Sequence, residues 1–203
     1  GPPGIRGLAF TLAGQATHAG TTPMDTRRDP GYLAGCIIQY LRMLSQKIEG
    51  LRATAGRVIF EPNLINVIPQ RVQFTADLRH RDGEILERAA QQVVQFVHTM
   101  AAPERVEVQL RTLADFAPVA FDPQLVQAIA DAAQSLGYSD QRLYSGAGHD
   151  AQLMARSCPA AMIFVPSRGG ISHNIAEDTA PEALVAGGRV LLRLMAQLAE
   201  VRG

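Results

Sequence analysis

Three histidines stand in short segments rich in glycine, serine or threonine, where an imidazole side chain can meet a ligand. His18 lies in "GQATHAGTTPM", His149 in "SGAGHDA" and His173 in "PSRGGISHNIAED". Imidazole binds metal ions and exchanges protons near neutral pH. These three segments are therefore the first candidates for catalysis or metal binding.

The surroundings of each histidine leave its role open. His18 follows a predicted strand and precedes a loop that ends at Pro23, so packing, metal binding and substrate contact all remain open. Glycines before His149 suit backbone N–H groups that approach a ligand, whereas its neighbour Asp150 has the alternative role of a helix cap. His173 lies in a glycine-rich loop after a predicted strand, at the sheet edge where open α/β folds bind ligands. This position favours a metal ligand or a catalytic residue.

Asn66 in "LINVIPQ" and Arg79 in "RVQFTADLRHRD" are further candidates for substrate binding. Asn66 stands at a strand entrance, where a turn role is the alternative. Apolar and polar residues alternate in the second segment, which places Arg79 on the polar face of a strand. A guanidinium there can hold a carboxylate through two parallel hydrogen bonds. The alternative is a surface ion pair with Asp77 or Asp82.

The first half of the chain predicts the elements that position His18, Asn66 and Arg79. Residues 7–12 alternate as a strand, and apolar residues at three- and four-residue steps predict a helix from about Asp29 to Gly50. The predicted core face of that helix is Tyr32, Leu33, Cys36, Ile37, Tyr40, Leu41, Leu44 and Ile48. Further predicted elements are strands over 57–63 and 71–82, a helix over 84–100 and a strand over 105–110.

The order of these elements is β-α-β-β-α-β, which predicts a ferredoxin-like domain over residues 5–116. Both helices are expected on one face of an antiparallel sheet, with the other face uncovered. His80 and His98 are predicted to be ordinary surface or helix residues.

The second half, residues 117–203, is dominated by helices. Asp122 and Pro123 predict the start of a helix that runs to Gly137. A capping box from Thr179 to Glu182 predicts the start of a long helix that ends near Ala199.

Between these two helices the sequence predicts short strands near Leu143 and over residues 161–167. Two or three short strands cannot cover such helices on both faces. This half is therefore expected to be the carboxyl-terminal part of an α/β domain, and the fold class of the chain is α+β.

Composition and charge narrow the function classes. Nineteen Lys and Arg residues balance nineteen Asp and Glu residues, so no nucleic-acid or membrane-surface partner is expected. No apolar run approaches the roughly 18 residues of a membrane span. Cys36 and Cys158 lack metal-binding spacing and are expected to be reduced thiols of a cytoplasmic protein. A small-molecule partner is therefore expected.

Four motifs, in this order along the chain, resemble the zinc-dependent amidohydrolases of the aminoacylase/carboxypeptidase superfamily. They are "GQATHAGTTPM", "PNLINVIPQRVQFTADLRHRD", "SGAGHDAQLMA" and "AMIFVPSRGGISHNIAED". The branch that they resemble holds N-carbamoyl-L-amino-acid hydrolases, allantoate amidohydrolases and β-ureidopropionases. The resemblance implies a lid and dimerisation domain over 5–116, a segment of the metal-dependent catalytic domain over 117–203, and a homodimer.

The resemblance also implies a role for each candidate residue. His18 becomes a catalytic contact to the substrate and transition state, reaching into the active site of the partner subunit. Asn66 and Arg79 hold the substrate carboxylate. His173 is a metal ligand, and His149 lines the pocket together with the backbone of Gly169 and Gly170.

The reaction that the resemblance implies is metal-assisted hydrolysis of a carbamoyl or ureido C–N bond in a substrate that carries a carboxylate. The full-length enzyme holds two zinc ions, or manganese, cobalt or nickel ions, per subunit, and a metal-activated water attacks the carbon. The other metal ligands and the general-base glutamate of such enzymes lie upstream of the lid. The chain is therefore expected to be a carboxyl-terminal piece that alone is inactive and does not retain metal.

Two alternatives compete with this hypothesis. One is a dipeptidase or aminoacylase of the same superfamily, and the other is a non-catalytic dimerisation or ligand-binding module built on the sheet domain. Upstream His, Asp and Glu ligands in the reading frame would favour the enzyme, and their absence would favour the module.

Overall fold

The computed structural model describes residues 1–200 of the 203-residue chain, which has mixed α and β structure. The chain divides into two compact units. One unit is Pro3–Pro118, and the other joins Gly1–Pro2 to the segment that begins at Val119. All the strands in the described part of the chain belong to the first unit.

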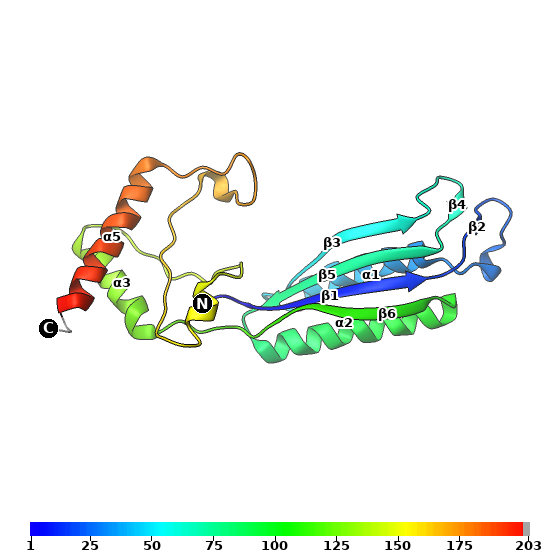
Figure 1. Ribbon diagram of the computed structural model, residues 1–203, viewed down its shortest axis with the longest axis horizontal. Helices are drawn as coiled ribbons and strands as arrows, with labels where there is room; N and C mark the ends of the chain where they lie inside the picture. Colours follow the sequence, from blue (N-terminus) through cyan, green and yellow to red (C-terminus); the bar gives the residue numbers. More distant parts are fainter. Residues whose placement is uncertain (201–203) are drawn as a thin grey trace. The chain divides into compact units, whose positions relative to one another are not determined.

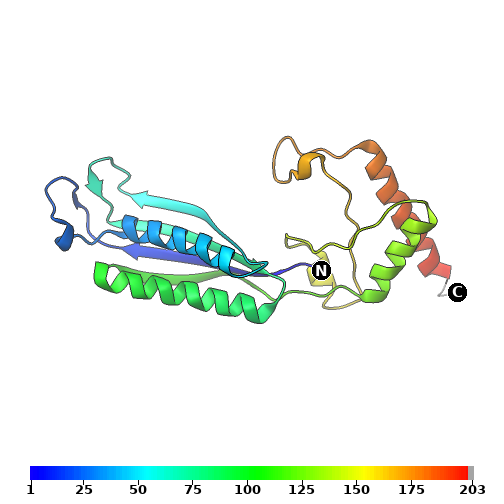
Figure 2. The same cartoon turned by 180° about the vertical axis from the view of Figure 1, so that it is seen from behind.

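The first unit is built on a four-stranded antiparallel sheet with the strand order β3-β5-β1-β6. Its main elements, in chain order, are β1 (Gly4–Ala13), α1 (Pro30–Lys47), β3 (Arg52–Glu61), β5 (Arg71–His80), α2 (Gly83–Glu104) and β6 (Glu107–Phe116). Both helices lie along one face of the sheet (Figures 1 and 2). The expected order β-α-β-β-α-β is therefore present.

Alternation along the strands places one row of apolar side chains against the helices. Val72, Phe74, Ala76 and Leu78 of β5 are all at most 1% exposed, as predicted. They join apolar residues of β1, α1 and α2 in one buried core. The intervening residues of β5, among them Gln73, Thr75 and Arg79, belong to the opposite face of the sheet and are half-buried.

The two helices begin at aspartate caps. The carboxylate of Asp29 accepts from the backbone N–H of Gly31 and Tyr32, at 2.8 and 3.1 Å, and Pro30 occupies the first turn of α1. Leu33 is fully buried, whereas Tyr32 is 53% exposed. The prediction that Tyr32 faces the core is therefore wrong, because neighbouring residues on a helix are about 100° apart and Leu33 occupies the centre of the buried face.

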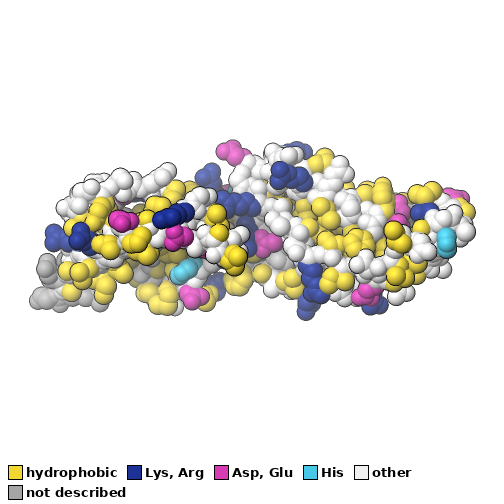
Figure 3. Space-filling model, turned by 90° about the horizontal axis from the view of Figure 1, so that it is seen from above, with side chains coloured by type: hydrophobic (Ala, Val, Ile, Leu, Met, Phe, Trp, Pro, Cys, Tyr) yellow, Lys and Arg dark blue, Asp and Glu magenta, His cyan; other side chains and the backbone are white. Residues whose placement is uncertain are grey.

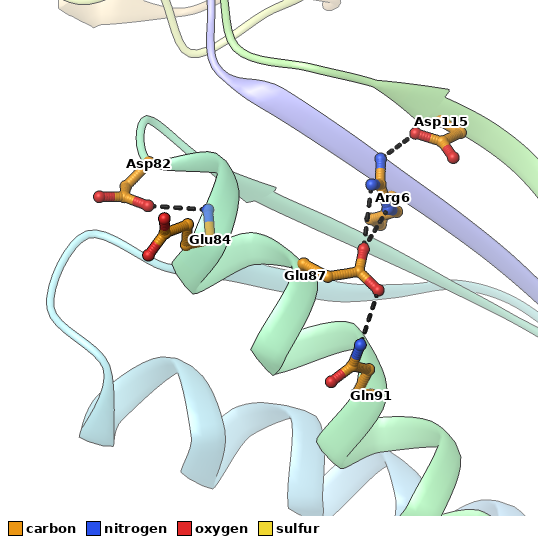
Figure 4. Close-up of polar contacts among 6 residues, drawn as sticks. All are labelled: Arg6, Asp82, Glu84, Glu87, Gln91 and Asp115. Atoms are coloured by element: carbon orange, nitrogen blue, oxygen red, sulfur yellow. Dashed lines mark hydrogen bonds and ion pairs between the residues drawn. The ribbon is translucent and has the colours of Figure 1, made fainter.

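An ion-pair cluster connects the sheet to α2 near the beginning of β1 (Figure 4). The guanidinium of Arg6 contacts Glu87 of α2, with Nη2 3.0 Å from Oε2, and also contacts Asp115 of β6. Gln91 donates to the other oxygen of Glu87 at 2.9 Å. This cluster cross-links three elements at the edge of the core.

The prediction that His80 is an ordinary surface residue is wrong, because it is 3% exposed. Its Nε2 lies 3.0 Å from the carbonyl oxygen of Glu49, and its Nδ1 accepts from the N–H of Asp82 at 2.9 Å. Gly50 has a φ of 78°, and a Cβ there would lie 3.3 Å from Nε2 of His80, so both conformation and space favour glycine. His80 therefore joins the loop after α1 to the start of α2. His98 is exposed on α2, as predicted.

The second unit contains two long helices, α3 (Pro123–Ser135) and α5 (Pro181–Glu200), with the short elements α4 (Ala151–Met154) and η2 (Arg168–Gly170) between them. Asp122 caps α3 by accepting from the N–H of Leu125 at 2.8 Å, as predicted. The predicted capping box is wrong in register. Helix α5 begins at Pro181, so Ala180, not Thr179, occupies the capping position.

The strands predicted near Leu143 and over residues 161–167 are not present, because both segments lack regular secondary structure. A strand needs a paired neighbour for its N–H and C=O groups, and the described residues of this unit provide no such partner.

The buried core of the second unit is small. It consists of Ala132, Ala133 and Val190, with Ile129, Tyr138 and Ile163 packed around them. Many apolar side chains stay on the surface, including Leu192 and Met195 of α5, which are 69% and 60% exposed. The space-filling view in Figure 3 shows such hydrophobic side chains at the surface. None of the helices in the described part of the chain is both long and apolar enough to cross a bilayer.

Candidate functional site

A two-stranded ribbon at one end of the sheet unit brings His18 and Asn66 together (Figure 1). Its strands are β2 (Thr17–His18) and β4 (Val67–Ile68), and His18 pairs with Val67. The N–H of Ala19 donates to the carbonyl oxygen of Asn66 at 2.9 Å. Both candidate side chains are exposed, so both are accessible to a ligand.

The ring of His18 is oriented by its own turn. Its Nδ1 accepts from the N–H of Gly20 at 3.0 Å. The carbonyl oxygen of His18 accepts from the hydroxyl of Thr22 at 2.8 Å. Because Nδ1 is an acceptor, the proton of the neutral ring sits on Nε2. Nε2–H is then a donor suited to an oxygen that gains negative charge.

Arginine side chains that the sequence analysis did not single out hold this turn. Arg27 donates to the carbonyl oxygens of Ala19 and Thr22, at 2.6 and 3.1 Å. Arg105, at the end of α2, donates to the carbonyl oxygen of Asp25 at 2.7 Å. The contact of Arg105 joins residues 80 positions apart, so no local sequence pattern could have predicted it, whereas the partners of Arg27 lie five and eight residues before it.

Arg79 lies on β5, where it pairs with Ile5 of β1 and Arg52 of β3. Its Nε and Nη2 donate to the two oxygens of Asp77, at 2.7 and 3.1 Å. These hydrogen bonds raise the pKa of Arg79 above its ordinary value, against the opposite effect of partial burial. The ion pair with Asp77, one of the two alternatives for Arg79, is therefore present.

The structure does not bring Arg79 to His18 and Asn66. The ribbon joins the sheet where Gly14 donates to Gln70 at 2.8 Å, next to the Arg71 end of β5. Arg79 lies eight residues farther along β5, which is about 26 Å at the usual rise of a strand. One copy of the chain therefore cannot place Asn66 and Arg79 on the same small carboxylate.

His149 stands at the start of α4 in the second unit. Its Nδ1 accepts from the N–H of Ala151 at 3.1 Å, and its carbonyl oxygen accepts from Gln152 at 2.8 Å. The side chain of Asp150 makes no capping hydrogen bond to α4. The alternative role of Asp150 as a cap is therefore wrong, and the imidazole of His149 accepts the hydrogen bond from the N–H of Ala151 instead.

The loop that contains Gly169, Gly170 and His173 is exposed, and its two ends are joined by contacts between Arg168 and Asp178. Arg168 and Asp178 pair through their side chains at 3.0 Å, and the N–H of Arg168 also donates to the carbonyl oxygen of Asp178. The backbones of Gly169, Gly170 and His173 have φ values of 63°, 67° and 57°. A positive φ is uncommon for a residue with a side chain, although histidine adopts it more readily than most.

Metal-binding side chains are sparse in the described part of the chain. No three His, Cys, Asp or Glu side chains there lie close enough together to hold a metal ion. The backbone N–H of His173 donates to the carboxylate of Glu177 at 3.0 Å.

Comparison with known proteins places these observations in a family context. Residues 8–197 match the family described as Peptidase family M20/M25/M40. Allantoate amidohydrolase of Bacillus subtilis (strain 168) is 40% identical over 197 residues, which are 97% of this chain and 48% of that protein. N-carbamoyl-L-amino-acid amidohydrolase of Rhizobium meliloti is 37% identical over 199 residues, which are 98% of this chain and 48% of that protein.

A solved structure shares the fold. The amidase of the hydantoinase/carbamoylase family from Burkholderia vietnamiensis superposes with a TM-score of 0.91 at 39% identity. The match covers 96% of this chain and 47% of the amidase. The chain thus spans about half the length of the proteins that it matches.

Proposed function

The chain belongs to peptidase family M20/M25/M40, and from this membership we propose that it forms part of an amidohydrolase that cleaves a carbamoyl or ureido C–N bond. The observation that carries the proposal is the 40% identity to an allantoate amidohydrolase across nearly the whole chain. The substrates that we propose are N-carbamoyl-L-amino acids or allantoate, which combine such a bond with a carboxylate.

We assign His18 the role of stabilising charge in the transition state. Attack of water on a carbamoyl carbon places negative charge on its oxygen, and a preorganised N–H donor aimed at that oxygen lowers the barrier. His18 has such a donor, because the amide of Gly20 occupies Nδ1 and leaves the proton on Nε2. Its exposure on a projecting ribbon lets it reach a substrate held elsewhere.

Asn66 and Arg79 are proposed to bind the substrate carboxylate, with His149 and the backbone of Gly169 and Gly170 along the pocket. The separation of about 26 Å along β5 requires two copies of the chain. We therefore propose a homodimer in which His18 and Asn66 of one copy meet a substrate held by Arg79 of the other. In this arrangement the sheet unit is a ferredoxin-like lid and dimerisation domain.

The donor set of the described residues does not by itself fit a zinc centre. Such a centre takes about three or four protein ligands, and the described residues gather no such group. We propose that His173 contributes a single imidazole ligand to zinc, or to manganese, cobalt or nickel, in the whole protein.

Mixing two inactive variants of the whole protein tests both the function and the shared site. H18A and R79A are each expected to lose hydrolysis of N-carbamoyl-L-amino acids or allantoate, whereas H98A, on the exposed side of α2, is expected to keep it. Random pairing of H18A and R79A makes about half of the dimers mixed, each with one intact site of two, so about a quarter of the wild-type activity should return. No recovery on mixing would contradict a site shared between two copies, and full activity of H18A would contradict the role of His18.

A further inference from the structure

The turn that carries His18 has almost no apolar support. Residues 18–26 include no buried side chain, and Met24 at its tip is 77% exposed. Exposed segments with few packed contacts open easily. Something other than packing must therefore keep the imidazole in one orientation.

The guanidinium of Arg27 provides that restraint. Its Nη2 donates to the carbonyl oxygen of Ala19 at 2.6 Å, and its Nε donates to the carbonyl oxygen of Thr22 at 3.1 Å. These two carbonyl groups enclose Gly20, the residue whose N–H binds Nδ1 of His18. The planar guanidinium of Arg27 thus holds the backbone on both sides of Gly20, whose N–H sets the tautomer of the His18 ring.

Arg105 anchors the same turn to the helical layer. It ends α2 in a left-handed conformation, with a φ of 54°. Its Nη2 donates to the carbonyl oxygen of Asp25 at 2.7 Å and also lies 3.4 Å from that of Arg27. The contacts run without a break from α2 through Arg105 and Arg27 to the turn of His18.

We propose that Arg27 is a positioning residue that holds the imidazole of His18 in its Nε2–H form and in the orientation that meets the substrate. This inference rests on the catalytic role proposed for His18. Arg27 does not touch the substrate; it acts through the backbone of the turn. The planar guanidinium matters, because its N–H groups reach two carbonyl oxygens at once and lysine offers only a point charge.

The neighbouring arginine provides a matched control. Arg28 is exposed, and its side chain has no hydrogen bond or ion pair to any residue within the described range. R27A and R28A therefore remove the same side chain one residue apart, and only R27A releases the turn.

The first test is NMR spectroscopy of the ring nitrogens of His18 in the 203-residue chain. Wild type and R28A should both show the Nε2–H tautomer, whereas R27A should show a mixture of tautomers and lose protection of the Gly20 amide against exchange. An unchanged tautomer and unchanged protection in R27A would overturn the proposal without affecting the function proposed for the enzyme.

The second test uses the whole protein and its kinetics. R27A should lower kcat by roughly ten- to a hundredfold, the scale expected when a catalytic group is misplaced, with little change in KM. The kcat of R27K should lie between those of R27A and wild type. The double variant H18A/R27A should have nearly the same kcat as H18A, because both substitutions remove the same contribution of the His18 ring. If H18A is inactive but R27A has wild-type kcat, the positioning role is wrong and the role of His18 stands. If H18A itself is fully active, the proposed role of His18 fails instead.

Discussion

Replacing Arg79 with lysine separates its contribution to stability from the role in substrate binding that we propose for it. The ion pair with Asp77 has side chains that are 31% and 40% exposed, and pairs of this kind contribute roughly 0.2–1 kcal/mol. R79K should therefore change the free energy of unfolding by less than about 1 kcal/mol. Loss of a desolvated bond to a substrate carboxylate costs much more, roughly 2–5 kcal/mol.

The kinetic effect follows from that difference. At about 1.4 kcal/mol per factor of ten, R79K should lower kcat/KM of the whole protein by at least about 30-fold. The assay compares a carboxylate substrate with its amide analogue, which should be a poor substrate for wild type and lose little further in R79K. R52K is the matched control, because Arg52 pairs with Arg79 across the sheet and is exposed. We expect R52K to behave as wild type.

Two outcomes would refute this reasoning. If R79K loses the same factor on both substrates, the contact with the carboxylate is not what was removed. If R79K unfolds well below the wild-type temperature, Arg79 supports the sheet and does not bind the substrate.

Four further predictions concern the chain itself. I37A, at a fully buried position, should lower the free energy of unfolding in guanidinium chloride by about 2–5 kcal/mol, and I65A, at a fully exposed position, by less than about 0.5 kcal/mol; similar losses would contradict the assigned core. H80A removes a buried ring together with its hydrogen bonds to the backbone of Glu49 and Asp82 and should cost about 1–3 kcal/mol, whereas H98A should be neutral in the same measurement. The backbone N–H of Ile85 lowers the pKa of Asp82 in the folded chain, so its stabilisation is present above the unfolded value of about 3.9 and is lost as the pH falls through the lower folded value. In thermal melts over this acidic range, D82N, which keeps a capping oxygen, should lose less stability than wild type. Because the resemblance assigns only one metal ligand to this chain, zinc should be lost on dialysis, and one or two zinc ions retained per chain in elemental analysis would contradict this.

Local patterns predicted the elements of the sheet unit well. The three- and four-residue steps of α1 and the alternation of β5 each depend on residues close in sequence, and both describe the observed core. The same alternation continues from Leu78 to His80 and could have predicted the burial of that histidine. Its polar side chain suggested the surface, but two backbone groups, the N–H of Asp82 and the carbonyl oxygen of Glu49, satisfy the two ring nitrogens.

Failures occurred where structure depends on distant partners. Residues 161–167 have the composition of a strand, but strand formation requires a neighbour that the described residues do not provide. The motif resemblance selected His18 and Asn66, although nothing local indicated that residues 48 positions apart would meet through a pair of two-residue strands. Arg105 was missed for the same reason, because its partners Asp25 and Arg27 lie about 80 residues away.

The chain enters and leaves the sheet unit at neighbouring positions. Its first and last strands are neighbours, with Ile5 opposite Phe116, and just outside them the N–H of Val119 donates to the carbonyl oxygen of Pro2 at 3.1 Å. The two ends therefore emerge side by side, about one strand spacing of 4.8 Å apart. A segment with such ends can be inserted into, or removed from, a single surface loop of a host protein without forcing the flanking residues apart. The sheet unit can therefore be moved between proteins as one continuous segment of the gene.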